Sequence, residues 1–280
     1  MMSLCGLPRN FILLILLLAF NPVAAQEAGQ EGITNYAYSV FVGTGRYNIG
    51  DRVIYVLRLP MAMDLRKPNY ETGKIGYRLL FPAAVGITDF DDIGEIPELD
   101  LSDLQTMTFT PGLEAQIPVK ANWLIKPFGQ AGLGWDLKSS SNAFVWGLGA
   151  RTRAWFGAND RWLIGGEVLW AGNNPKYENE PTTRFSRVAF GAEYKWQTNW
   201  QPFGRRVSWH LRGIHWAYAN AFNLEPPIEE INIDNSTEIG VSFGIYPPLN
   251  ILGYKFRQGG IGYERSDEFN AIKLFTTFPF

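Results

Sequence analysis

The chain has 280 residues, a formal net charge of −2 and an aromatic content of 15%. It lacks the basic excess of nucleic-acid-binding proteins, so we expect no nucleic-acid partner, and no motif indicates a cofactor. The single cysteine, Cys5, stands in the first segment, which excludes disulfide bonds and thiolate chemistry from the predicted mature chain.

The first segment has the pattern of a secretory signal peptide. Arg9 supplies a positive start, residues 11–20 form an apolar core, and small residues up to Ala25 suit cleavage. An apolar core of this length is too short to span a membrane as a helix, which needs about 20 residues. We therefore predict three segments: a cleaved signal peptide over 1–25, a short periplasmic lead over 26–34 and a β-barrel over 35–280.

Alternation of apolar and polar residues dominates the rest of the chain, and helical periodicity is nearly absent. The alternating segments are long for strands of soluble proteins, and their length suits strands that cross a membrane. We predict twelve strands, over residues 35–46, 49–60, 73–85, 104–118, 121–136, 143–157, 160–172, 182–196, 205–220, 236–247, 251–265 and 268–280.

The alternating faces are of a particular kind. One segment sets Phe144, Trp146, Leu148 and Ala150 against Gly147, Gly149, Arg151 and Arg153. In a soluble sandwich the glycine-and-charge face would meet water, whereas in an outer-membrane barrel it lines the lumen and the apolar face meets lipid. The signal peptide, the strand lengths and the aromatic content favour the barrel, which must close because lipid tolerates no unpaired strand edge. We predict an all-β, transmembrane antiparallel barrel of about twelve strands in the outer membrane of a Gram-negative bacterium, in contact with membrane lipids and lipopolysaccharide.

Connection lengths indicate an even strand count with both termini in the periplasm. Long connections are expected outside, over 86–103, 173–181 and 221–235, and tight ones inside, at 119–120, 158–159 and 248–250. The connections over 61–72 and 197–204 are longer than this rule expects on the inner side.

The chain ends in NAIKLFTTFPF, which alternates apolar and polar residues up to its last position. We expect this strand to pair with the first strand and to turn its apolar side chains to lipid. The ending also resembles the signal that the barrel assembly machinery reads during biogenesis, although Pro279 departs from the usual pattern. The resemblance implies a signal formed by Ile272, Leu274, Phe278 and Phe280.

The segment FTPGLEAQIPVKANWLIKPFGQAGLGWD, residues 109–136, is similar to a hairpin of autotransporter translocator barrels. In that hairpin a strand with a glycine and an acid leads to a strand of the form L-x-P-[FY]-x-x-A-G. The matching residues here are Gly112, Glu114, Leu124 or Ile125, Pro127, Phe128, Ala131 and Gly132. Only residues 26–34 separate the predicted signal peptide from the first strand, so the resemblance implies a solitary barrel without a passenger domain.

The two histidines of the chain, His210 and His215, are the candidates for chemistry. Outer-membrane lipid hydrolases pair a serine with a histidine, and an acid or amide orients that histidine. Their signatures place the serine two residues after the histidine, where Arg212 and Ala217 stand here, whereas Ser208 precedes His210 on the same strand face. We expect no catalytic residue, and keep a lipase or lipid A deacylase that uses Ser208 and His210 as the alternative. Odd spacing puts the two histidines on opposite faces, so we expect no metal site.

The phase of alternation predicts a basic lumen. The inward acids are Glu114, Glu167, Glu193 and Glu238. The more numerous inward basic residues are Arg58, Arg78, Lys126, Arg151, Arg153, Arg187, Lys195, Lys255, Arg257 and Lys273. The third connection has the opposite charge, with Asp89, Asp91, Asp92, Glu95, Glu98, Asp100 and Asp103 and no Lys or Arg.

Several functions fit this charge distribution. A basic lumen would favour anions, like a porin, or the acidic connection could fold inward and constrict it. The charges could also pair across strands and fill a narrow barrel. Carboxylates of the connection could bind calcium, although their spacing does not match an EF-hand. Our first expectation is a non-enzymatic barrel with a structural or permeation role; besides the hydrolase, a surface adhesin acting through 86–103 and 221–235 remains open.

Overall fold

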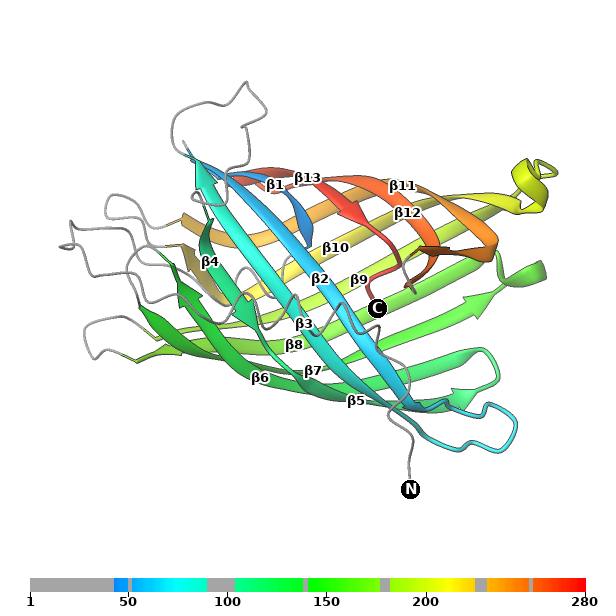
Figure 1. Ribbon diagram of the computed structural model, residues 1–280, viewed down its shortest axis with the longest axis horizontal. Coiled ribbons are helices and arrows are strands. Elements are labelled where there is room, and N and C mark those ends of the chain that lie inside the picture. Colours follow the sequence, from blue (N-terminus) through cyan, green and yellow to red (C-terminus); the bar gives the residue numbers. More distant parts are fainter. Residues whose placement is uncertain are drawn as a thin grey trace.

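The computed structural model describes residues 43–49, 52–89, 104–137, 141–176, 182–224, 231–251 and 254–280. In this part of the chain one antiparallel sheet closes on itself (Figure 1). Its strands are β1 (Thr44–Ile49), β2 (Arg52–Arg66), β3 (Gly76–Asp89), β4 (Leu104–Phe109), β5 (Gly112–Lys120), β6 (Trp123–Asp136), β7 (Asn142–Phe156), β8 (Trp162–Pro175), β9 (Thr183–Gln197), β10 (Arg206–Leu224), β11 (Ile231–Ile251), β12 (Tyr254–Arg265) and β13 (Phe269–Phe275).

The strands make a barrel of twelve, because β4 and β5 follow one another along the same place in the wall. Both pair with β3 on one side and with β6 on the other. The break falls at Thr110 and Pro111. Proline has no N–H to donate to the ladder and therefore interrupts a strand. The twelve-strand antiparallel barrel predicted from alternation is confirmed in the described residues.

Most strands occupy the segments predicted for them. The segments 121–136, 143–157 and 182–196, for example, correspond to β6, β7 and β9. The first predicted strand, over 35–46, lies largely outside the described residues, as do most of the acidic residues of the connection 86–103. Asp89 ends β3, whereas Asp91, Asp92, Glu95, Glu98, Asp100 and Asp103 fall in the stretch that is not described.

The wall has an apolar outer face and a charged inner face. On β7 Phe144 and Leu148 are about half exposed, and Ile239 on β11 is 63% exposed. The inward carboxylates of Glu114 and Glu238 are buried. A belt of exposed large apolar side chains is what lipid requires of a barrel exterior. No helix in the described residues is long and apolar enough to cross a membrane.

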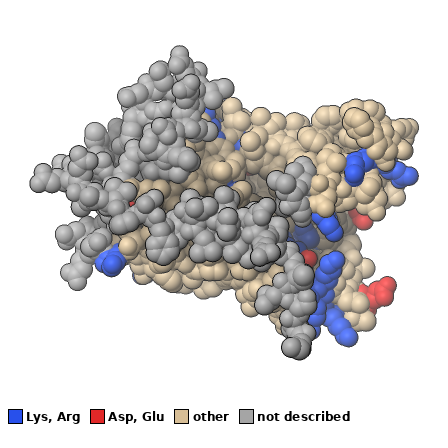
Figure 2. Space-filling model, viewed as in Figure 1, with Lys and Arg blue, Asp and Glu red and all other residues tan. Residues whose placement is uncertain are grey.

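The two ends of the barrel differ. The short helical turns η2 (Ala158–Asp160) and η3 (Pro202–Gly204) and the β2–β3 connection lie at one end, which we call the η3 end (Figure 1). In Figure 2 most of the visible Lys and Arg side chains lie toward this end. Toward the opposite end an apolar cluster fills the interior; it includes Tyr47, Ile49, Phe185, Ile233 and Phe269.

β1 closes the barrel, because it pairs with β2 on one side and with β13 on the other. These pairings reach only to Val56 on β2 and over Phe269–Leu274 on β13. Among the described residues, β2 from Leu57 onward pairs with β3 alone, and Tyr254–Gly259 of β12 pairs with β11 alone. Among the described residues, the closing seam is therefore shorter than the long pairings such as β6–β7 and β7–β8.

The C-terminal residues do not continue the last strand. β13 ends at Phe275, and the following residues turn into the lumen. Ile272 and Leu274 lie exposed on the outer face as expected, but Phe278 and Phe280 are only 4% and 1% exposed. The prediction that these two phenylalanines face lipid is therefore wrong.

The residues after β13 are better accommodated by packing inside the lumen than by pairing at the edge of the sheet. Pro279 cannot donate to a ladder, so a strand is weakened there. The rings pack against Ile214, Trp216 and Ala189 inside the barrel. Gly165 leaves room for them, since a Cβ on this residue would lie 2.7 Å from Phe278 and 2.8 Å from Phe280. Whether the ending also serves as an assembly signal stays a prediction.

Candidate functional site

A serine, a histidine and a glutamate meet on the inner wall near the η3 end. Ser208 and His210 lie two residues apart on β10 and therefore share one face of the strand. Glu193 comes from the neighbouring strand β9, where it pairs with Arg212. The carboxylate thus lies diagonally across from His210, within reach of its side chain.

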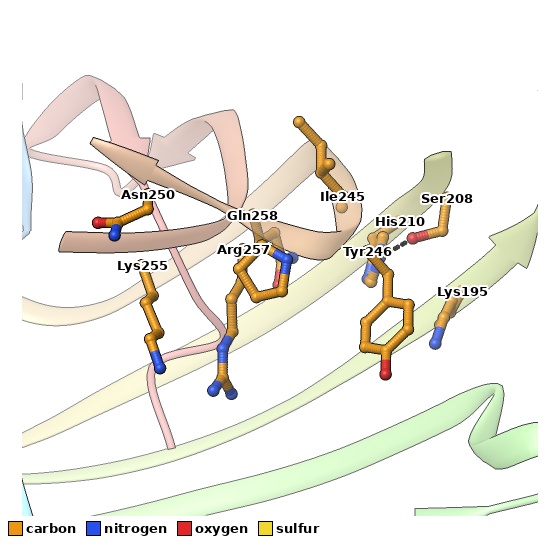
Figure 3. A pocket seen from close by; sticks show the side chains of 11 residues that line it. Lys195, Ser208, His210, Ile245, Tyr246, Asn250, Lys255, Arg257 and Gln258 are labelled. Carbon is orange, nitrogen blue, oxygen red and sulfur yellow. Dashed lines mark hydrogen bonds between the residues drawn. The ribbon is translucent and has the colours of Figure 1, made fainter. Parts of the chain in front are cut away.

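The three side chains form a continuous chain of hydrogen bonds. The Ser208 Oγ lies 2.9 Å from His210 Nε2 (Figure 3), and His210 Nδ1 lies 2.8 Å from Glu193 Oε1. An ionised carboxylate only accepts hydrogen bonds, so the Nδ1 atom carries the proton and leaves Nε2 free to accept from the serine hydroxyl. This is the order of groups that activates a serine nucleophile.

The Glu193 carboxylate is itself held in place by hydrogen bonds. Gln258 on β12 donates from Nε2 to Glu193 Oε2 at 3.1 Å and to Ser242 Oγ at 2.7 Å. The Glu193 side chain is 5% exposed and that of His210 is 11% exposed. A buried carboxylate with both oxygens bonded holds the imidazole in one orientation, as a positioned base requires.

Gly244 keeps the space in front of the serine open. It pairs with Ser208 across β10 and β11. A Cβ on Gly244 would lie 2.7 Å from Ser208 Oγ and 2.9 Å from His210 Nε2, closer than side-chain carbons approach such atoms. A side chain here would therefore crowd the Ser208 hydroxyl and the His210 ring.

The serine and histidine open into a cavity of about 520 Å³. The β11–β12 register shifts between Gly244 and Leu249, so the bulged part of β11 widens the wall at this point. Lys195, Lys255 and Arg257 line the cavity. Figure 3 shows these three side chains extending toward the same side as Tyr246, away from the ribbons of β11 and β12. The cavity therefore combines a serine hydroxyl bonded to a histidine with three basic side chains.

The remaining predicted basic residues lie deeper. A second cavity of about 1200 Å³ occupies the centre of the lumen. Its lining includes seven of the ten residues predicted as lumen basic, namely Arg58, Arg78, Lys126, Arg151, Arg153, Arg187 and Lys273. The other three line the smaller cavity. The structure thus divides this predicted set between a central group and a group at the η3 end.

Acidic residues pair with part of the central group. Glu167 bonds Arg151 at 2.7 Å and Arg187 at 2.5 Å, and Glu114 lies 3.6 Å from Arg151. On another part of the wall Lys273 bonds both Glu238 and Glu264 at 2.8 Å, and Arg212 pairs with Glu238. Cross-strand pairing therefore accounts for some of the inward charge.

Sequence reasoning missed three inward residues that bond to others on the inner wall: Arg212, Gln258 and Glu264. It also did not predict that Glu193 orients His210. Alternation predicts that Glu193 points inward, but its partner depends on the β9–β10 register, which the irregular connection at η3 conceals. Gln258 and Glu264 were missed because the bulge opposite β12 changes which residues face inward. His215 stands on the outer face, with Nδ1 3.0 Å from Thr237 Oγ1, and takes no part.

No protein-family model and no curated protein matches the sequence. Among solved structures, the chain is similar to the β domain of the Bordetella autotransporter BrkA, with a TM-score of 0.53 and 11% identity over 82% of this chain and 92% of that chain. It also matches OmpTdeltaL8, a loop deletion mutant of an outer membrane protein of Vibrio cholerae, with a TM-score of 0.32 and 10% identity over 80% of this chain and 74% of that chain. The chain therefore has the fold of an autotransporter β domain.

Proposed function

We propose that the barrel is a hydrolase of acyl esters that carry an anionic group, with Ser208 as its nucleophile. The observation that carries this proposal is the chain of hydrogen bonds from Ser208 through His210 to Glu193 at the edge of a cavity. This develops the alternative that the sequence left open. The fold itself does not bear on activity, because one fold supports many functions.

The proposed hydrolysis proceeds in two steps. Ser208 Oγ attacks the ester carbonyl, its proton passes to His210 Nε2, and the C–O bond to the alcohol breaks as His210 returns the proton to the leaving oxygen. Water then attacks the acyl-serine in the same way and releases the carboxylic acid. Glu193 does not exchange a proton; its negative charge stabilises the imidazolium that forms in each step.

The lining of the cavity indicates the class of ester. Lys195, Lys255 and Arg257 bring three positive charges and, among the described lining residues, no acid faces them. Such charge attracts an anionic substrate group and stabilises the oxyanion of the tetrahedral intermediate. Phospholipids and lysophospholipids combine an acyl ester with a phosphate, and they surround the mouth of a membrane barrel.

The decisive experiment compares mature wild-type protein, refolded in detergent, with Ser208→Ala. The substrates are p-nitrophenyl butyrate and phosphatidylglycerol in mixed micelles. We expect kcat/KM to fall by about 10³-fold or more, because removal of a nucleophile leaves only the contribution of binding. His215→Ala is the matched control and should keep wild-type turnover, since His215 lies on the outer face. Equal turnover by the Ser208→Ala and wild-type proteins, both shown folded by heat-dependent gel migration, would refute the assignment.

The non-enzymatic role expected first from the sequence is the second candidate, as a path for anions. It is favoured by the central cavity, whose described lining includes eight Lys and Arg but four Glu. Single-channel recording of the wild-type protein in a planar bilayer tests it. Discrete steps with anion preference would support permeation, and a silent bilayer that contains folded protein would exclude it.

A further inference from the structure

Among the described residues, three cations of the central cavity form no ion pair, although Glu114 and Glu167 lie within electrostatic range of them. Arg78, Arg151 and Arg187 pair with Glu114 or Glu167, but Arg58, Lys126 and Arg153 form no ion pair within the described part of the chain. The Nε atoms of Arg58 and Arg153 are buried without a hydrogen-bond partner there. Lys126 is only 5% exposed. Burying a charge without an ion pair costs free energy of folding, so we looked for a ligand that these three cations could bind.

The three cations face one space from different parts of the wall. Lys126 on β6 pairs with Arg151 on β7, which places Arg153 diagonally beside it, at a Cβ separation of about 7–8 Å. Arg58 comes from β2 and lines the same cavity. It lies within electrostatic range of Arg151, Glu167 and Arg187, although it forms no ion pair with Glu167. Positive charge therefore converges on the cavity from more than one side.

We propose that this part of the lumen is a binding site for a small polyanion that carries two or more phosphate groups, held by Arg58, Lys126 and Arg153. Guanidinium groups match phosphate oxygens in geometry, and lysine adds a compact charge. Because the cations lie on separate strands, the anion that bridges them must be charged at more than one point. The site is distinct from the cavity at Ser208 and does not depend on hydrolysis.

Inorganic pyrophosphate is the probe, titrated calorimetrically into the refolded mature barrel in detergent at low ionic strength. We expect saturable binding by the wild-type protein and a Kd at least about tenfold weaker for Lys126→Met, since the variant loses one charge-assisted contact with the anion. Lys74→Met, which removes an exposed lysine from the β2–β3 connection, is the matched control and should bind like the wild type. Ser208→Ala should also bind unchanged, which separates this site from the proposed hydrolase.

A second variant guards against a folding defect. Lys126→Glu should fold, because the new carboxylate faces Arg153 and supplies the missing partner, yet it should abolish binding. Pyrophosphate should also raise the temperature at which the wild-type protein loses its folded gel band, and this shift should vanish in both Lys126 variants. Absence of binding by the folded wild-type protein would overturn the proposal, as would equal affinity in the Lys126→Met and Lys74→Met proteins.

Discussion

At the scale of single residues, Gly244 is as informative as the serine it faces. It lies on a strand with no requirement for a left-handed backbone, so the sheet itself would accept alanine. What it provides is space, because any β-carbon there would stand against both Ser208 Oγ and His210 Nε2. A residue without a side chain can thus be necessary for a reaction without touching the substrate.

Gly244→Ala should therefore reduce hydrolysis while leaving the barrel folded. A displacement of reacting groups by about 1 Å can cost on the order of 10²-fold in rate, and we expect a loss of kcat of that size. Gly213→Ala is the matched control, because a Cβ on Gly213 meets nothing within 4 Å. The measurement is kcat from steady-state kinetics of the two folded variants. An unchanged kcat in Gly244→Ala would contradict the proposal that Gly244 keeps space open beside Ser208.

At the scale of elements, the C-terminal tail belongs to the interior and not to the wall. Arg212 holds its start: its Nη1 donates to the Thr277 carbonyl at 3.2 Å, and its guanidinium lies over the Phe275 ring. The ring of Phe280 packs 5.7 Å from that of Trp216, centre to centre. The tail thus links the end of β13 to β10 across the lumen.

Phe280→Ala should destabilise the barrel. A fully buried phenylalanine contributes about 1.5–3 kcal/mol through the apolar surface that it removes from water. We expect the variant to lose its folded, faster-migrating gel band at a lower temperature than the wild type. Leu274→Ala is a suitable comparison, since Leu274 is 60% exposed on the outer face, where lipid replaces water. A lumen-facing tail is contradicted if Phe280→Ala melts like the wild type and Leu274→Ala does not.

The strands follow from sequence wherever alternation is regular. Residues 146–153 alternate regularly between an apolar face and a face of glycine and arginine, and β7 lies where the pattern puts it. The end of β13 could not be predicted in this way, because Phe278 and Phe280 continue the period although their rings pack inside. Period alone cannot tell lipid from an apolar pocket on the inner wall, and only the packing partners on distant strands decide between them.

At the scale of the whole molecule, the interior is arranged in layers along the barrel. The apolar cluster lies toward one end, the charged cavity occupies the centre, and Ser208 and His210 lie near the η3 end. The basic character of the lumen follows from alternation. The layering does not, because it depends on cross-strand register, which brings together residues such as Glu193 and His210 from different strands.

The inward position of Phe278 and Phe280 also has a consequence for the order of events as the barrel forms. Their place beside Ile214 and Trp216 exists only once β8, β9 and β10 stand next to one another. Before these strands meet, Phe278 and Phe280 lack their packing partners, and in the closed barrel both rings are buried. We therefore expect the assembly signal that the sequence predicts on Phe278 and Phe280 to be accessible only before the barrel closes, since both rings are buried in the closed barrel.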